Sequence, residues 1–318
     1  MRFGGHETFP IRLGWLSKAL ILIDKASQQQ QPLRALDSVE VFDALGVGRN
    51  MAKSIWHWLQ VTRLAEKAVP ELPALGETAV ETHKGKREQS IRLTALGRLL
   101  VRRDRYLQRV GSWWALHANI VSQRDAALAW RWFFNDFPRT RFDRGHCLDE
   151  FAHYAQREFK RKLSLTTLSR DVSCMLASYS RTVPVEVDDP ENASHCPLSE
   201  LNLLVHFRDA AMYERGFRSR SIPPELFGYS LAVAQLGSFA EDSIQLSFND
   251  ALVVSGSPGR IFALDAEGLA ALVSSTSSHS AIAFRELMHG GERVLEGPAR
   301  TEVFWLNHYF DRLGATKE

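Results

Sequence analysis

Hydrophobic residues recur at steps of three and four near the start of the chain, which is the pattern of helices with one apolar face. The run from Leu13 to Ile23 predicts one such helix, and the polar stretch before Pro32 is expected to end it. Ser38 offers an N-cap for a second helix. A third helix is predicted from Arg49 to Gln60, directly after a glycine turn.

Alternating apolar and polar residues then predict a pair of short strands, Thr78–Thr82 and Ser90–Leu93. Thr94 is expected to cap a further helix. The predicted order is helices, a glycine turn, another helix and a strand pair with a basic tip. This is the order of a winged helix-turn-helix, so we expect this fold at the N-terminus. The basic tip carries Lys84, Lys86 and Arg87.

The helix predicted from Arg49 to Gln60 would be the one that enters the major groove of DNA. At about 100° per residue, Met51, Ile55 and Trp58 share one face and are expected to be buried. The opposite face carries Arg49, Lys53, Trp56, His57 and Gln60. The residues predicted to contact DNA are Arg49, Asn50, Lys53, His57, Lys84, Lys86 and Arg87. The alternative is a winged helix that binds protein and leaves this basic face in solvent.

The middle of the chain, residues 111–182, is rich in helix signals and aromatic side chains. An apolar stripe from Leu148 to Leu163 and another that begins after Ser164 predict two helices with basic outer faces. This pair fits either a second helix-turn-helix or an ordinary helical hairpin. The aromatic residues are expected to form core, with base stacking as the alternative. They are Trp113, Trp114, Trp130, Trp132, Phe133 and Phe134.

Residues 183–195 are polar, acidic and proline-containing, which is typical of a linker. Beyond them, helices are predicted over residues 198–207, 224–236, 265–274 and 300–313, with a pair of strands within 248–262. The chain is therefore predicted to be mainly α, with an N-terminal winged helix-turn-helix followed by helical domains and a few short strands.

Charge changes along the chain, although the net charge is only +2. Residues 1–110 hold 18 Lys and Arg against 11 Asp and Glu (+7), residues 111–182 hold 11 against 7 (+4), and residues 183–318 hold 10 against 19 (−9). We expect three domains with these bounds: a winged-helix DNA-binding domain, a basic helical domain and an acidic, mostly helical domain. The basic part suits double-stranded DNA, and the acidic part suits a basic protein surface. The alternative is a drift in composition between domains.

The composition is ordinary for a globular protein, at 45% hydrophobic and 24% charged residues. It excludes collagen, a wholly disordered chain and a disulfide scaffold. No apolar run approaches the roughly 20 residues of a membrane span, and no secretory leader is recognised, so we expect a cytoplasmic protein that does not contact a membrane. The cysteines suit a reducing compartment, and their spacing matches no zinc site. They are Cys147, Cys174 and Cys196.

One short motif, Gly4-Gly5-His6-Glu7-Thr8-Phe9-Pro10, carries candidate chemistry. Its two glycines let the backbone approach something closely. Together with Arg12, it offers a general base in His6, a metal carboxylate in Glu7 and a phosphate clamp in the arginine. The alternative is a structural motif at the start of a helix, with His6 hydrogen-bonded inside. The sequence contains no phosphate-binding loop, nucleophile elbow or zinc-helix motif.

The same residues carry a resemblance to a known family. GHETFP with Arg12, Gly14 and Trp15, the segment LGVGRNMAKSIWHWL and the segment LTALGRLL resemble the bacterial family called domain of unknown function number four thousand and seven. Looser matches continue to the last helix around Tyr309, so the resemblance spans nearly the whole chain. Members of that family are similar to the DNA-nicking subunit of single-strand DNA phosphorothioation systems.

The resemblance implies a protein that nicks DNA in a modification and phage-defence system, so that sulfur can replace a non-bridging phosphate oxygen. It implies a cysteine desulfurase, an ATPase and a PAPS-reductase-like sulfur-transfer protein as partners. His6, Glu7 and Arg12 are the candidate catalytic residues, with Mg²⁺ or Mn²⁺ as the expected cofactor. Two alternatives are a non-catalytic DNA-binding adaptor or regulator that recruits the sulfur-transfer enzymes, and a scaffold that binds only protein.

Overall fold

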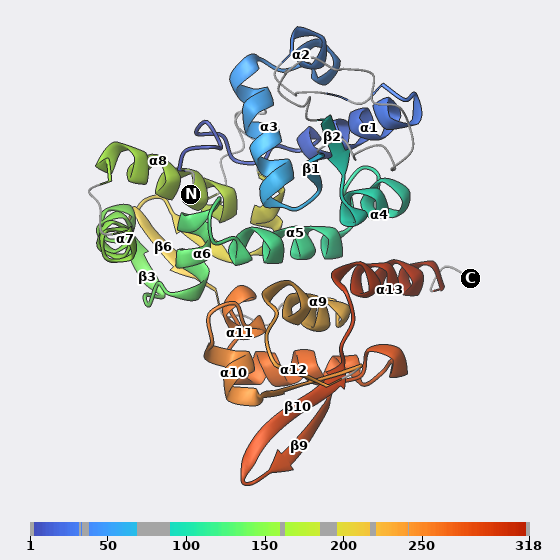
Figure 1. Cartoon of the computed structure of the whole chain (residues 1–318). Helices are drawn as coiled ribbons and strands as arrows, with labels where there is room; N and C mark the ends of the chain where they lie inside the picture. The colour runs from blue at the N-terminus through green and yellow to red at the C-terminus, as the bar shows by residue number, and fades with distance from the viewer. Residues whose placement is uncertain are drawn as a thin grey trace.

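The computed structural model describes residues 3–31, 33, 38–68, 90–159, 163–184, 196–216, 221–240 and 242–315. The described elements are mainly helical, with a few short strands, as predicted. They are stacked in three levels along the long direction of the molecule (Figure 1). A single hydrophobic core contains buried residues from all three levels. Within the described part of the chain, no helix has the length and apolar character needed to cross a membrane.

The first level contains the N-terminal helices and one pair of strands. Helix α1 packs against α2, α3 and α4. Thr94 caps α4 as predicted, because its Oγ1 accepts a hydrogen bond from the amide of Gly97 at 3.0 Å. The elements are α1 (Trp15–Gln28), α2 (Val39–Leu45), α3 (Arg49–Val61), β1 (Ala65–Ala68), β2 (Ser90–Leu93) and α4 (Ala95–Arg103).

The strand pair of this level differs in part from the predicted one. Strand β2 lies where it was expected, and its antiparallel partner is β1, with Ala65 opposite Leu93 and Ala68 opposite Ser90. The predicted strand Thr78–Thr82 lies outside the described residues. So do the basic residues Lys84, Lys86 and Arg87. Three helices followed by β1 and β2 are compatible with a winged helix, which stays a prediction.

The second level is built around aromatic side chains. The six aromatic residues predicted to be core are all buried, and Phe133 and Phe134 are at most 1% exposed. This confirms that packing accounts for them, because their faces are covered by other side chains. The helices are α5 (Val110–Ser122), α6 (Leu128–Asn135), α7 (Arg144–Phe159) and α8 (Leu165–Tyr179).

A four-stranded sheet of order β3-β6-β5-β4 completes this level. Strands β4 and β5 run parallel, and the other neighbours run antiparallel. The strands are β3 (Arg141–Asp143), β4 (Ser180–Val183), β5 (Leu204–Phe207) and β6 (Met212–Arg215). They come from both sides of residues 183–195, so a domain boundary placed there would divide one sheet.

The helix predicted over residues 198–207 is wrong. Only Pro197–Leu201 is helical, as a short 3-10 turn. Asn202 then adopts a left-handed conformation with φ 54°, which ends the turn. The next residues pair between β4 and β6 as strand β5. Pairing with strands distant in the sequence therefore decides their structure.

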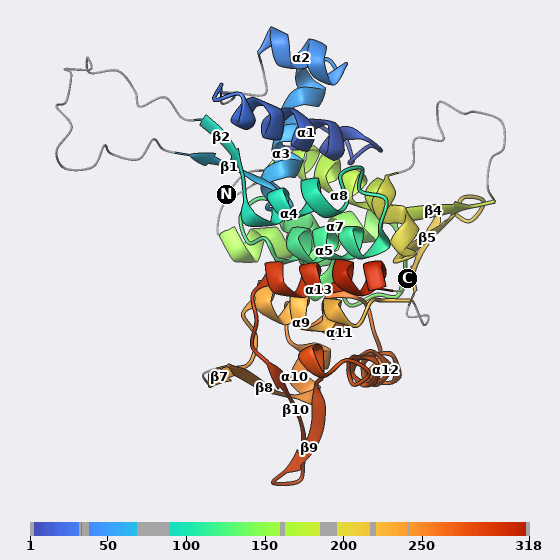
Figure 2. The same cartoon turned by 90° about the vertical axis from the view of Figure 1, so that its right-hand side faces the viewer.

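The third level combines short helices with a second four-stranded sheet of order β7-β8-β10-β9. Its hairpin β9–β10 projects from the end of the molecule (Figures 1 and 2). The elements are α9 (Glu225–Ala234), β7 (Ser238–Ala240), β8 (Ser243–Ser247), α10 (Phe248–Val253), α11 (Pro258–Ile261), α12 (Ala266–Thr276), a 3-10 turn (Ser280–Ile282), β9 (Arg285–His289), β10 (Glu292–Pro298) and α13 (Glu302–Ala315).

The pair of strands predicted within residues 248–262 is also wrong, because α10 and α11 occupy this stretch. Both helices have a serine N-cap. Ser247 Oγ accepts from the amide of Asp250 at 2.9 Å, and Ser257 Oγ accepts from the amide of Arg260 at 3.4 Å. These caps satisfy amides that would otherwise lack a partner, which favours helix over strand.

The last helix returns to the first two levels. Helix α13 lies between α9 on one side and α4 and α5 on the other (Figure 2). Arg312 donates two hydrogen bonds to the buried carboxylate of Glu225, at 2.7 and 3.0 Å. The hydroxyl of Tyr309 accepts a bond from the amide of Gly111 at 3.2 Å. The C-terminal helix is thereby fixed to both α9 and α5.

Candidate functional site

The N-terminal motif is anchored by a buried hydrogen-bond network. His6 is 2% exposed. Its Nε2 lies 2.9 Å from Oδ1 of Asp171 on α8, and the same oxygen accepts from the amide of Gly4 at 3.1 Å. The amide of Thr8 donates to Nδ1 of His6 at 3.0 Å. Because Nδ1 accepts, the ring proton of a neutral His6 lies on Nε2 and is donated to Asp171.

This network changes how His6 is interpreted. Both ring nitrogens already have hydrogen-bond partners in the folded chain. To act as a general base, His6 would have to break one of these buried bonds first. The geometry therefore agrees with the structural alternative for this residue, in which the imidazole holds the motif in place.

Asp171 is the residue of this network that sequence reasoning missed. It lies three residues after Leu168 and four before Met175, on the apolar side of α8, and it is 4% exposed. A single acidic residue within an apolar helix stripe was the signal that could have revealed it, because a buried carboxylate requires hydrogen-bond donors.

The two glycines of the motif have separate roles. Gly4 has φ +67°, a left-handed conformation that side chains disfavour. Gly5 lies against α3, where an added Cβ would come within 2.5 Å of Nδ1 of His57. The close backbone approach expected from the sequence is therefore present, and what the backbone approaches is helix α3.

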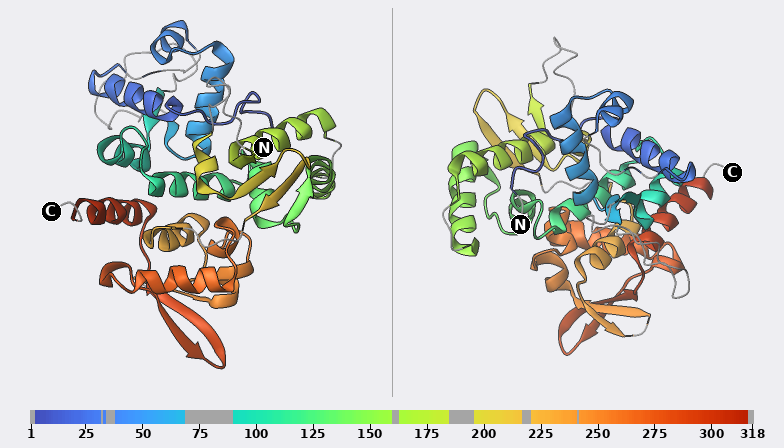
Figure 3. Two further views of the ribbon diagram at one scale, coloured as in Figure 1. Left: turned by 180° about the vertical axis from the view of Figure 1, so that it is seen from behind. Right: turned by 45° about the horizontal axis from the view of Figure 1, so that its top comes forward.

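Helix α3 is covered on two sides. Figures 1 and 3 show it between α1 and α8. On the side of the N-terminal motif, the carbonyl of Phe9 accepts from Nε1 of Trp58 at 3.0 Å and from Oγ of Ser54 at 3.4 Å. The ring of Trp58 also packs edge-on against Trp130 of α6, at 5.3 Å between centroids. The side of α3 opposite α1 is therefore largely interior.

The placement of His57 on an open face is wrong for this reason. Its side chain is 3% exposed and packs against the rings of His6 and Trp58. A helical wheel assigns one buried face, and here the N-terminal segment buries a second face. His57 is thus a buried residue of α3 in this structure.

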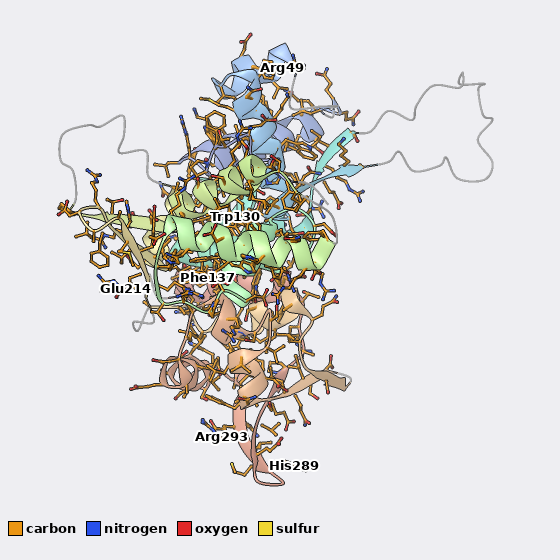
Figure 4. The ribbon with its side chains drawn as sticks, turned by 90° about the vertical axis from the view of Figure 1, so that its left-hand side faces the viewer. Arg49, Trp130, Phe137, Glu214, His289 and Arg293 are labelled. Atoms are coloured by element: carbon orange, nitrogen blue, oxygen red, sulfur yellow. The ribbon has the colours of Figure 1, made fainter. Side chains whose placement is uncertain are left out.

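The N-terminal end of α3 remains open. Arg49 and Asn50 are exposed, and Lys53 is half-buried. Figure 4 shows Arg49 at one extremity of the molecule, far from Trp130 in the interior. The first residues of a recognition helix are those that contact base edges in helix-turn-helix proteins. This end of α3 is therefore accessible from solvent.

Glu7 and Arg12 are more accessible than His6. Both side chains are partly exposed. Glu7 has φ 50°, and the guanidinium of Arg12 lies over the rings of Phe9 and Trp15, at 5.6 and 5.4 Å from their centroids. A guanidinium stacked on aromatic rings keeps its in-plane N–H groups available for an anion.

The described residues do not form a ready metal site. Among them, no group of three or more His, Cys, Asp or Glu side chains is placed to hold a metal ion. The cysteines are buried and free, and burial raises the pKa of Cys147 and of Cys196 to about 12. They are therefore neutral thiols in the core.

The fold and this site define a mainly helical protein whose N-terminal GHETFP motif packs against α3 and is hydrogen-bonded to α8. The chain belongs to the family described as protein of unknown function DUF4007, whose model matches residues 3–304. This confirms the resemblance seen in the sequence motifs. No curated protein matches the chain.

Two solved structures are similar to this chain: an SspB crystal structure and a magnesium ion-bound SspB crystal structure. Each is 23% identical to it, with a TM-score of 0.78. The alignment covers 97% of this chain and 88% of the other in both cases. At this level of identity, the likeness establishes a shared fold.

Proposed function

We propose that this chain binds DNA as a component of a DNA phosphorothioate modification and phage-defence system, and that it nicks one DNA strand. The observation that carries the proposal is the fold shared with SspB over 97% of the chain. The GHETFP and LGVGRNM motifs agree with it, because they resemble a family similar to the nicking subunit of such systems.

The DNA-binding part of the proposal is a winged helix formed by α1, α2, α3, β1 and β2. Arg49, Asn50 and Lys53 at the open end of α3 would contact phosphates and base edges. Lys84, Lys86 and Arg87, between β1 and β2 in the sequence, would add phosphate contacts. The acidic residues of the region 183–318 would then be available to a cysteine desulfurase, an ATPase or a PAPS-reductase-like protein.

The chemical part of the proposal rests on the N-terminal motif. Glu7 would supply a carboxylate for Mg²⁺ or Mn²⁺, and Arg12 would hold a phosphate. His6 would keep these residues in place through its bond to Asp171. In this proposal, the partly exposed side chains of Glu7 and Arg12 contact metal and phosphate, and the buried side chain of His6 holds the motif in position.

Supercoiled plasmid incubated with purified protein and Mg²⁺ or Mn²⁺ tests the proposal. Relaxed circles are expected with the native chain and should be strongly reduced by Glu7→Gln. The matched control is Glu267→Gln, which removes one exposed carboxylate on α12. If Glu7→Gln relaxes the plasmid as fast as the native chain does, the carboxylate of Glu7 has no role in DNA nicking.

A second candidate function is a non-catalytic adaptor that recognises DNA and recruits sulfur-transfer enzymes. The engaged ring nitrogens of His6 and the lack of a metal-ligand cluster among the described residues favour it. In the same assay, it predicts DNA binding that weakens with salt and plasmid that stays supercoiled.

A further inference from the structure

An exposed basic surface lies where α4 is followed by α5, and it contains none of the residues proposed above to contact DNA. We call it the arginine loop; it consists of Arg102, Arg105, Tyr106 and Arg109. All four side chains are exposed, and Tyr106 is 64% exposed. The exposed ring of Tyr106 presents a flat face on which another ring can stack.

The acidic residues nearest in the fold do not neutralise this surface. Asp104 is buried, and its carboxylate accepts bonds from the amides of Gln108 and Arg109, at 2.8 and 3.0 Å. Asp311 on α13 is paired with Arg103. Among the described residues, the three arginines of the loop form no ion pair, so three positive charges face solvent.

The loop is also held in one conformation. Leu107 inserts into the core at 4% exposure, with φ 53°. Its carbonyl accepts from Nε1 of Trp113 at 2.9 Å, and its amide donates to the carbonyl of Asp104 at 2.8 Å. A preformed loop loses little conformational entropy when it binds, which favours affinity.

The basic surface continues along α4. Arg98 precedes Arg102 by four residues, so both lie on one face of the helix. Arg98 also lines a cavity of about 530 Å³, in which Arg63 and Arg92 are paired with Glu302 and Glu66. Arg98 and Arg102 therefore extend the basic surface from the loop along α4.

We infer that the arginine loop binds single-stranded DNA. Its arginines would contact successive phosphates, and the exposed ring of Tyr106 would stack on an unpaired base, the combination that nucleic-acid proteins use for single strands. Duplex DNA has no unpaired base for this ring. The inference rests on the proposed function for the identity of the polymer, and it adds a surface for an unpaired stretch of DNA.

The test is binding of a fluorescent single-stranded oligonucleotide, and of the matching duplex, to the full chain. The triple variant Arg102→Glu, Arg105→Glu, Arg109→Glu should weaken single-strand binding at least tenfold. It should also lower the slope of log affinity against log salt by about two, because three phosphate contacts are lost. Tyr106→Ala should weaken single-strand binding about fivefold or more and leave duplex binding unchanged.

The control variant is Lys18→Glu, Arg124→Glu, Arg285→Glu, which reverses the same number of charges at exposed sites elsewhere. Thermal melting establishes that each variant folds. Equal weakening by the two triple variants, or single-strand affinity unchanged in the loop variant, overturns the inference. A different result separates the inference from the proposed function. If Arg49→Glu with Lys53→Glu leaves DNA affinity unchanged while the loop variant loses single-strand affinity, the proposed winged-helix contact is wrong and the inference stands.

Discussion

Nε2 of His6 lies 2.9 Å from Oδ1 of Asp171, although 165 residues of chain separate the two. This bond joins the N-terminal motif to α8, and the motif in turn covers the second side of α3. The family motif GHETFP therefore has a structural role in addition to any chemistry. The open end of α3, with Arg49 and Lys53, is held in place by this arrangement.

Replacing Asp171 tests the structural role directly. Asp171→Ala leaves the ring N–H of His6 and the amide of Gly4 buried without their acceptor. We expect a loss of about 2–3 kcal/mol in the free energy of unfolding. Urea denaturation followed by tryptophan fluorescence measures it. Asp125→Ala, at an exposed position, is the control, and equal stability of the two variants would contradict the network.

Gly5 provides an independent test of the contact with α3. The methyl group of Gly5→Ala would lie 2.5 Å from Nδ1 of His57, so the motif or the helix must shift. We expect a cost of about 1–3 kcal/mol in unfolding free energy. Gly48→Ala has open space around the added methyl and should change stability much less. A native melting temperature in Gly5→Ala would show that the segment is not packed as described.

The bond between Glu225 and Arg312 predicts a pH dependence. Burial raises the pKa of Glu225, but the hydrogen bonds and charge of Arg312, together with hydrogen bonds from the Glu225 amide and His308, lower it by more, so the net pKa lies below the ordinary value of 4.5. A lowered pKa stabilises the fold above the ordinary value, and this contribution is lost as the pH falls through the folded-state pKa. Glu225→Gln should therefore cost about 3 kcal/mol at pH 7 and progressively less below pH 4.5.

Urea unfolding at several pH values measures this difference. Glu267→Gln, on the exposed side of α12, should follow the native chain at every pH. A stability difference for Glu225→Gln that stays constant down to pH 3 would contradict the ionised pair.

Charge reversal at the open end of α3 tests the DNA-binding surface. Arg49→Glu with Lys53→Glu should weaken duplex binding at least tenfold, because two attractive phosphate contacts become repulsive. Folding should be unaffected, since both side chains reach solvent. The control is Arg124→Glu with Arg285→Glu. If the α3 variant binds duplex DNA as tightly as the control variant does, α3 does not contact DNA.

Helices with a regular apolar stripe could be predicted from the sequence, because their burial pattern is local. Residues 15–28 and 165–179 form helices close to the expected ranges. Residues 204–207 could not be predicted, since pairing with strands distant in the sequence determines their structure. The apolar residues 252–254 predict a strand within 248–262, but the serine caps at Ser247 and Ser257 favour the two helices that the structure shows.

The candidate site shows the same limit. The glycines and the buried interpretation of His6 could be inferred from the motif alone. Asp171 and the burial of His57 could not, because each depends on which distant segment packs against its helix. Sequence periodicity identifies one apolar face of a helix, whereas α3 is covered on two.

The most direct measurement is the affinity of the purified chain for duplex DNA across a range of salt concentrations. The account predicts binding that weakens steeply as salt rises, because several Lys and Arg side chains displace counterions from phosphates. Affinity that is absent at low salt, or that does not change with salt, would contradict the central claim and favour a scaffold that binds only protein.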